Sequence, residues 1–236
     1  MTNLPTSCEE ALDLLRAHGD AERAKGLAEH HKVPRAYLGV PNGTLGDLAQ
    51  EWRQGLDLSA RLSLADALWQ TDIFEARITA AKLLTQARIR PDDGAVWDML
   101  LSWMPDFDSW AIADQVITAA QKRLVADPSR IETVAEWTTS SDHWIKRAAM
   151  IIALPFAKQN HPTEAELAVR VRVLGWAADY VRDADWTLQK SVAGWLRDLS
   201  KHDPERVEYF LSNHARHMKP FARKEAVKFL PQHPAP

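Results

Sequence analysis

Cysteine is nearly absent from this 236-residue sequence, which contains Cys8 alone, and tyrosine occurs only three times. A single thiol excludes a disulfide within the chain and a thiolate metal cluster, and it fits a reducing compartment. No apolar run is long enough to cross a bilayer, and residues 1–10 lack the basic-then-apolar pattern of a signal peptide. We therefore expect a cytoplasmic protein without a membrane partner.

Signatures of nucleotide and metal sites are missing as well. The sequence has no P-loop and no dinucleotide-binding glycine motif. His214 and His217 have a helical, ligand-like spacing, but no Asp or Glu completes a metal site with them. We expect neither a metal nor another cofactor.

Excess positive charge is also lacking, because 29 Lys and Arg residues stand against 32 Asp and Glu residues, a formal net charge of -3. This balance counts against indiscriminate nucleic-acid binding, although a sum hides how charge is distributed. Acidic residues dominate positions 9–20, whereas basic residues gather from Lys146 onward. Two interpretations stay open: a basic face on an acidic protein, or ordinary solvated helix faces.

Patterns typical of β-strands do not occur in the sequence. No segment shows a sustained alternation of apolar and polar residues, and no β-hairpin dipeptide lies between two apolar runs. Apolar residues instead recur at helical spacing, and Pro155 should bend or end the helix that contains it. The predicted helices cover residues 8–18, 21–31, 45–54, 59–69, 74–87, 95–103, 108–125, 130–138, 143–157, 164–181, 186–201, 205–213 and 220–230, with a loop at 33–44. We predict an all-α fold of short helices.

Four of these helices share a form in which a basic residue precedes small and apolar residues. The segments begin at Glu75, Ile145, Leu188 and Ala222. Their intervals, about two periods of roughly 35 residues and then about 43 and 34, match HEAT or armadillo helix pairs. Such pairs stack into an α-α superhelix, or solenoid, here one domain over residues 1–236. The basic residues would line its concave surface as a track for phosphates, or extend outward as snorkelling side chains.

The segment 108–114, with the sequence DSWAIAD, predicts a helix start with Asp108 or Ser109 as N-cap. Trp110 and Asp114 are then one turn apart on one face. An aromatic ring face and a carboxylate both favour developing positive charge, so the pair suits a cationic, sugar-like transition state. The structural alternative is a buried tryptophan next to a surface aspartate.

The segment 141–149, with the sequence SDHWIKRAA, resembles the most diagnostic motif of the AlkD-like DNA alkylation repair glycosylases. Trp110 and Asp114 match the Trp-x-x-x-Asp of that family, and residues 190–201 and 223–226 are similar to its two C-terminal repeats. The resemblance is clear from about residue 74 to residue 230. It implies a HEAT-like repeat solenoid with a concave cleft for duplex DNA.

The resemblance also implies an activity, the excision of positively charged alkylated purines such as 3-methyladenine and 7-methylguanine, which leaves an abasic site. Such a base departs as a neutral molecule, so no general acid has to protonate it. By resemblance, Asp114 stabilises the oxocarbenium-like cation and orients water, Trp110 packs on the deoxyribose, and Arg147 holds a backbone phosphate. The expected partner is double-stranded DNA containing alkylated purines, bound by a monomer. The further residues expected to contact the DNA are Lys146, Lys190, Arg197, Arg223 and Lys224.

One motif departs from the family pattern. The family carries a second active-site tryptophan in a Gly-Trp-x-Leu-Arg pattern, whereas this chain has Gly194-Trp195-Leu196-Arg197. An ungapped match puts Gly194 at the tryptophan position and Trp195 about 100° further around the helix. We include Trp195 among the catalytic candidates, with a core position as the alternative. The alternative function is a non-catalytic helical-repeat module that binds DNA or a protein.

Overall fold

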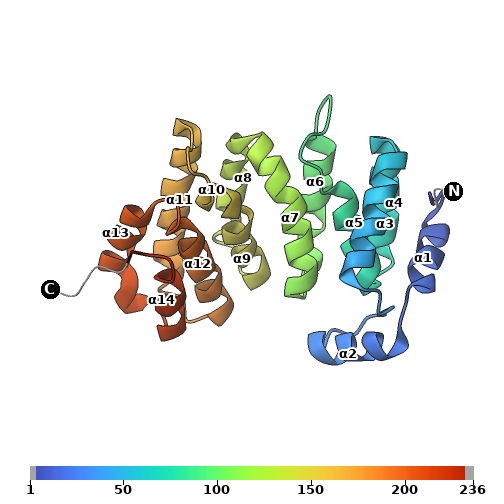
Figure 1. The fold of residues 1–236 in the computed structure, drawn as a ribbon, viewed down its shortest axis with the longest axis horizontal. Helices are drawn as coiled ribbons and strands as arrows, with labels where there is room; N and C mark the ends of the chain where they lie inside the picture. The colour runs from blue at the N-terminus through green and yellow to red at the C-terminus, as the bar shows by residue number, and fades with distance from the viewer. Residues whose placement is uncertain (1–3, 232–236) are drawn as a thin grey trace. The chain divides into compact units, whose positions relative to one another are not determined.

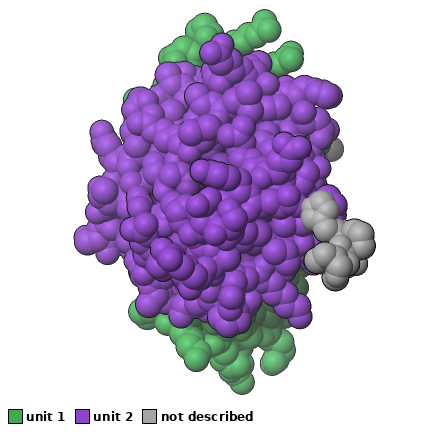
Figure 2. Space-filling view, turned by 90° about the vertical axis from the view of Figure 1, so that its left-hand side faces the viewer, with its two compact units in different colours: residues 1–123 green, residues 124–236 purple. Residues whose placement is uncertain are grey.

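The computed structural model of the chain describes residues 4–231. Within this range helices are the regular elements, and β structure is limited to an isolated parallel bridge between Ala36 and Ile73. The all-α prediction is therefore confirmed. No helix in this range is both long and apolar enough to span a membrane. The chain divides into two compact units, residues 1–123 and 124–236 (Figures 1 and 2). One continuous repeat domain over 1–236 stays a prediction.

The first unit is organised around α5 (Phe74–Leu84), on which only Lys82 is not buried. This helix packs against both α3 (Asn42–Gly55) and α4 (Leu58–Gln70). This enclosure fits its composition, since apart from Glu75, Arg77 and Lys82 it has apolar or small residues all round rather than along one stripe. The other elements are α1 (Cys8–Ala17), α2 (Ala21–His31), α6 (Gly94–Ser102), the 3-10 turn η1 (Met104–Asp106) and α7 (Trp110–Ala126), whose last turn belongs to the second unit.

A buried carboxylate fixes the loop between α2 and α3. Glu75 on α5 is fully buried and accepts the backbone N–H groups of Leu38 (2.8 Å) and Gly39 (2.7 Å). Gly39 has a φ of 77°, and a Cβ at this position would lie 2.0 Å from the carbonyl oxygen of Asp20. Only glycine fits such a close approach at positive φ. The loop is therefore held in the position that presents Arg35 and Tyr37 to the start of α7.

Arg77 shows that the recurring basic residue is not always part of a phosphate track. Its guanidinium carbon lies 4.7 Å from the ring centroid of Trp69, and its Nε donates to the Trp69 carbonyl oxygen (3.2 Å). Trp69 in turn stacks on Trp103, with ring centroids 4.5 Å apart. In the first of the four similar segments the basic side chain is thus part of the core, and the expectation of a surface position is wrong there.

The second unit is organised around α12 (Trp186–Leu199), which packs against α9 (His143–Ile152), α10 (Leu154–Ala157) and α14 (Pro220–Ala226). The helix predicted over residues 143–157 is interrupted at Ala153, and Pro155 lies in the first turn of the short α10, as its missing N–H favours. The remaining elements are η2 (Pro128–Arg130), α8 (Ile131–Trp137), α11 (Glu164–Tyr180), α13 (Pro204–His214) and η3 (Ala215–His217).

Side-chain caps begin several helices of this unit. Asp142 accepts the backbone N–H of Trp144 (2.7 Å), and Asp185 accepts that of Thr187 (2.7 Å). Thr163 forms a capping box with Glu166 at the start of α11. These caps satisfy N–H groups that have no partner within the helix. They fix where α9 and α12 begin, and therefore where Arg147 and Trp186 lie along them.

Candidate functional site

Trp110 is the first residue of α7 and its side chain is 50% exposed. Asp114 lies one turn further along the same helix and is partly buried. Opposite the exposed edge, Ile112, Ala113 and Val116 face the core of the first unit. The predicted geometry of an aromatic ring and a carboxylate one turn apart is therefore present on a helix that is rigidly packed.

An ion pair holds the entry to α7. Arg35, whose side chain is 3% exposed, binds the carboxylate of Asp108 and lies 3.3 Å from that of Asp72. Asp108 is thus engaged by Arg35, and the Ser109 hydroxyl is buried without a hydrogen-bond partner among residues 4–231. Ser109 begins the helix through its carbonyl oxygen, which accepts the N–H of Ala113 (3.1 Å). The Arg35 pair, which the sequence did not predict, therefore positions the turn that carries Trp110.

Two histidines of α2 lie against the Trp110 ring. The ring centroid of His31 is 5.7 Å from that of Trp110, and the centroid of His30 is 6.3 Å away. His31 also contacts Phe74 at 4.7 Å and Tyr37 at 6.3 Å. Burial, reinforced by the electrostatic effects of His30 and Arg35, lowers the pKa of His31, against the opposing effect of Asp108. Near neutral pH the His31 imidazole is consequently uncharged.

In the second unit, Lys146 and Arg147 follow the Asp142 cap on α9, and both are partly buried. Lys146 Nζ lies 3.2 Å from a carboxylate oxygen of Asp183, and its carbonyl oxygen accepts the Tyr180 hydroxyl (2.8 Å). The backbone N–H of Asp185, followed by Lys146, lowers the pKa of Asp183 despite partial desolvation. Part of the Lys146 charge is therefore already neutralised within the protein.

The structure differs from the prediction at Trp195. This side chain is fully buried in the second unit, and its Nε1–H donates to the carbonyl oxygen of Ala153 (3.1 Å). Gly194, the position that an ungapped match aligns with the family tryptophan, carries no side chain, and a Cβ there would meet no atom within 4 Å. These facts favour the core alternative, and we leave Trp195 outside the site proposed below.

Trp186, at the start of the same helix, was missed by the sequence reasoning. It is 52% exposed, and of the ten tryptophans only Trp110 and Trp186 are exposed rather than buried or partly buried. The Nζ of Lys190 lies 4.6 Å from the Trp186 ring centroid. Nine residues separate Trp186 from Trp195, about two and a half helical turns, so they lie on opposite faces. An aromatic residue four before a lysine, at a capped helix start, was the available signal.

The remaining DNA-contact candidates fall into two groups. Lys190, Arg223 and Lys224 are exposed. Arg197 is partly buried between the carboxylates of Asp198 and Glu225, which raise its pKa. A cation paired twice has little charge left for a phosphate, so the exposed group is better suited to contact DNA.

A sequence profile of the family described as "DNA alkylation repair enzyme" matches residues 11–230. The chain belongs to this family. The match reaches the first helix, well before residue 74, where the recognisable motifs begin. The helices of both units are therefore part of what this chain shares with the family.

Solved structures show the same fold. The structure described as a predicted DNA alkylation repair enzyme from Enterococcus faecalis has a TM-score of 0.74 at 18% identity, over 92% of this chain and 98% of that one. AlkD2 from Streptococcus mutans has a TM-score of 0.65 at 19% identity, over 96% and 100%. The protein smu.31 from Streptococcus mutans UA159 has 0.63 at 19%, over 95% and 100%. A search of curated proteins found no match.

Within residues 4–231 no three His, Cys, Asp or Glu side chains are grouped so that they could hold a metal ion. His214 and His217, which have ligand-like spacing in the sequence, lie at the junction of α13 and η3. The His217 Nε2 accepts a hydrogen bond from Arg216 Nε at 3.0 Å, so it is used within the protein.

Proposed function

We propose that this DNA alkylation repair enzyme is an N-glycosylase that excises positively charged alkylated purines, 3-methyladenine and 7-methylguanine, from duplex DNA. The observation that carries the proposal is the exposed Trp110 one turn before Asp114. A half-exposed tryptophan offers a large ring face that a ligand can cover. An aromatic face next to a carboxylate favours a cation, which is the charge that develops on the sugar during base excision.

The chemistry follows from the charge of the lesion. When the C1′–N bond breaks, its electron pair goes to the purine and cancels the positive charge of that base, so the base leaves without a general acid. The sugar becomes oxocarbenium-like, and the Asp114 carboxylate stabilises it and orients a water molecule. That water adds to C1′ and loses a proton, either to Asp114 or to solvent. The Trp110 ring packs on the deoxyribose and excludes competing water.

The roles proposed for the second unit concern the DNA backbone. Arg147 would bind a phosphate, for which its planar, multiply donating guanidinium is well suited. Lys190, Arg223 and Lys224 would add charge contacts, since all three side chains are exposed. Trp186 would offer a second exposed aromatic face to the duplex. None of these residues needs to read a base edge, so we expect selectivity to come from the charge of the lesion.

The decisive experiment is base release from methylated duplex DNA by the unaltered protein and by Asp114→Asn. We expect 7-methylguanine and 3-methyladenine to be released, and Asp114→Asn to be slower by about 100-fold or more, as is usual when one stabilising group for transition-state charge is removed. Asp66→Asn is the matched control, because Asp66 is an exposed aspartate of α4. Equal rates for Asp114→Asn and the control would contradict the proposed role of Asp114.

A second candidate is a non-catalytic module that binds DNA or a protein. The burial of Trp195 favours it, because that residue does not supply the second aromatic wall expected from the family pattern. If the unaltered protein releases no base but binds duplex DNA with an affinity that falls steeply with salt, the DNA-binding form of this candidate is correct. If it does not bind duplex DNA at all, a protein scaffold is indicated.

A further inference from the structure

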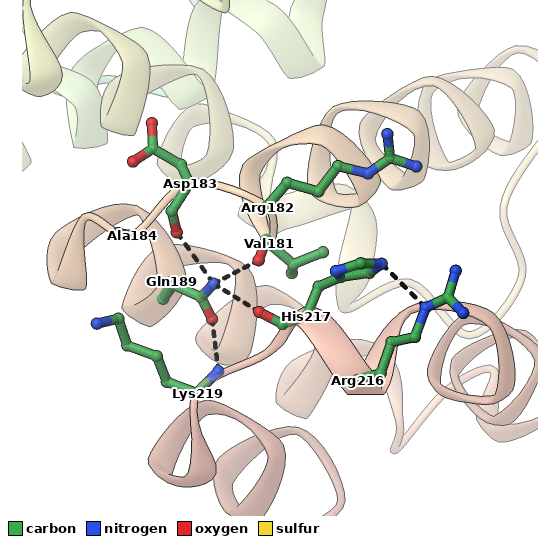
Figure 3. Close-up of a pocket in the computed structure, with 8 residues that line it drawn as sticks. All are labelled: Val181, Arg182, Asp183, Ala184, Gln189, Arg216, His217 and Lys219. Atoms are coloured by element: carbon green, nitrogen blue, oxygen red, sulfur yellow. Dashed lines mark hydrogen bonds between the residues drawn. The ribbon is translucent and has the colours of Figure 1, made fainter.

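A pocket of about 600 Å³ in the second unit has three cationic side chains among its eight lining residues. Arg182 comes from the end of α11, Arg216 and His217 come from η3, and Lys219 precedes α14. In Figure 3 the Lys219 side chain lies on one side, the Arg182 and Arg216 guanidinium groups lie on the other, and the His217 ring lies between them. A concave site with three permanent positive charges is unusual on a chain whose formal net charge is -3.

These charges are not used inside the protein. Within residues 4–231, the side chains of Arg182, Arg216 and Lys219 form no ion pair at 4.0 Å or less. Other arginines of the same unit are paired with carboxylates, as Arg172 is with Glu132 and Arg206 is with Asp203. Three cations that line one concavity without an ion-pair partner favour an anionic ligand there.

A buried amide builds the pocket. Gln189 of α12 is 1% exposed, and its Nε2 donates toward the carbonyl oxygens of Val181 (2.6 Å), Asp183 (3.2 Å) and His217 (3.3 Å). Its Oε1 accepts the backbone N–H of Lys219 (3.0 Å). One side chain thus fixes the backbone of the two loops that carry the cations (Figure 3). The arrangement is organised before any ligand arrives, which reduces the entropy cost of binding.

The local electrostatics agree with an anion site. Desolvation, followed by Arg182, His217 and Arg216, lowers the pKa of the neighbouring His214. Arg216 is also oriented, since its Nε donates to His217 Nε2 and its two Nη groups are left for a ligand. The carboxylate of Asp183 at the rim is compensated by Lys146, whose Nζ is 3.2 Å away.

The neighbours of the pocket indicate where the anion comes from. Asp183 is bonded to Lys146 of α9, the residue before the phosphate-binding candidate Arg147. Ala184, which also lines the pocket, is two residues before the exposed Trp186. The pocket is thus continuous with the residues to which we assign backbone contacts. A phosphate of the same DNA strand is a closer match than a free metabolite.

We propose that Arg182, Arg216 and Lys219 form a second phosphate-binding pocket, which takes a DNA backbone phosphodiester away from the lesion. This inference rests on the proposed function for its ligand source, but its test does not depend on base excision. The pocket would also bind free inorganic phosphate, which has the same tetrahedral oxyanion group. The experiment distinguishes a DNA phosphodiester from free phosphate.

The test compares full-length variants for affinity to a fluorescent, lesion-free duplex over a range of salt concentrations. Arg216→Gln with Lys219→Gln should weaken binding at low salt by at least about tenfold. It should also reduce the slope of log affinity against log salt by about one, the contribution of one phosphate. The control is Arg172→Gln with Lys158→Gln, which removes the same charge from cations already paired with Glu132 and Asp198. The charge-retaining Arg216→Lys with Lys219→Arg should keep the slope.

Each outcome decides between the sources. If the duplex slope is unchanged but inorganic phosphate shifts the His217 ring signals in NMR only in the unaltered protein, the pocket holds free phosphate and its assignment to DNA is wrong. If the paired-cation control lowers the slope equally, or if neither ligand responds, the pocket proposal fails. Base release from methylated DNA by the same unaltered protein tests the glycosylase proposal separately, so either proposal can fail alone.

Discussion

Replacing Gln189 by methionine should destabilise the second unit strongly, although the two side chains are similar in size and flexibility. Gln189 is 1% exposed, and its amide connects the end of α11, the end of η3 and the start of α14 through four hydrogen bonds. Methionine fills nearly the same volume without any donor or strong acceptor. The substitution therefore removes the polar contacts and leaves packing almost unchanged.

The expected magnitude follows from the number of bonds that can form at once. The amide nitrogen has two hydrogens for three carbonyl oxygens, so at most two of these three contacts are well aligned, and Oε1 adds one more. Three hydrogen bonds at about 1 kcal/mol each give roughly 3 kcal/mol. The Val181 carbonyl loses its partner in a buried place and the Lys219 N–H in a partly buried one, which raises the total to about 3–5 kcal/mol. For a chain of this length that corresponds to a fall in Tm of about 10 °C.

Urea unfolding followed by tryptophan fluorescence and by circular dichroism measures this loss. Gln70→Met is the matched control, because Gln70 is exposed on α4 and its replacement should change stability by no more than about 0.5 kcal/mol. A loss below about 1 kcal/mol for Gln189→Met, with an unchanged m-value, would refute the role of this amide as the brace of the pocket. The anion-binding test would then lack its structural basis.

Three further predictions concern other parts of the chain. Trp195→Ala should lower the free energy of unfolding by about 3–5 kcal/mol, because it removes a fully buried ring. Trp186→Ala should lower it by less than about 1 kcal/mol and should weaken duplex binding. Denaturation and binding assays on both variants check this, and a larger loss of stability for Trp186→Ala than for Trp195→Ala would overturn the assignment of the two tryptophans. Gly194→Ala should stabilise the protein by about 0.5–1 kcal/mol, since its Cβ meets nothing within 4 Å in the middle of α12; a lower Tm would argue against that geometry. The pKa of His31, lowered by burial and then by His30 and Arg35, should lie below 6.5 in an NMR titration. Because the folded state prefers the neutral ring, its stabilising contribution is complete above the unfolded-state pKa of 6.5 and is lost as pH falls from there through the lower folded-state pKa, and His31→Gln should make this loss smaller.

Local structure could be predicted from the sequence because its causes are local. Asp142, Thr163 and Asp185 cap α9, α11 and α12 through side chains two or three residues from the groups they satisfy. Pro155 interrupts its helix for an equally local reason, since it lacks an N–H. The family motifs around Trp110 and Arg147 are likewise short, so the helical repeat fold and the family could be inferred without coordinates.

Exposure and pairing, in contrast, were decided only by tertiary structure. Helical periodicity gives the angle between two residues but not which of them faces a neighbouring helix. The sequence therefore did not show which of Trp186 and Trp195 is exposed. The packing of α12 against α9 and α10 buries Trp195 and leaves Trp186 exposed. Arg77 and Lys190 occupy equivalent places in similar segments, yet one lies over a core tryptophan and the other is exposed. The sequence by itself determined the helices, their caps and the family; the pocket around Gln189 arose from the packing of residues about 30 positions apart, because only folding brings their side chains within hydrogen-bonding reach.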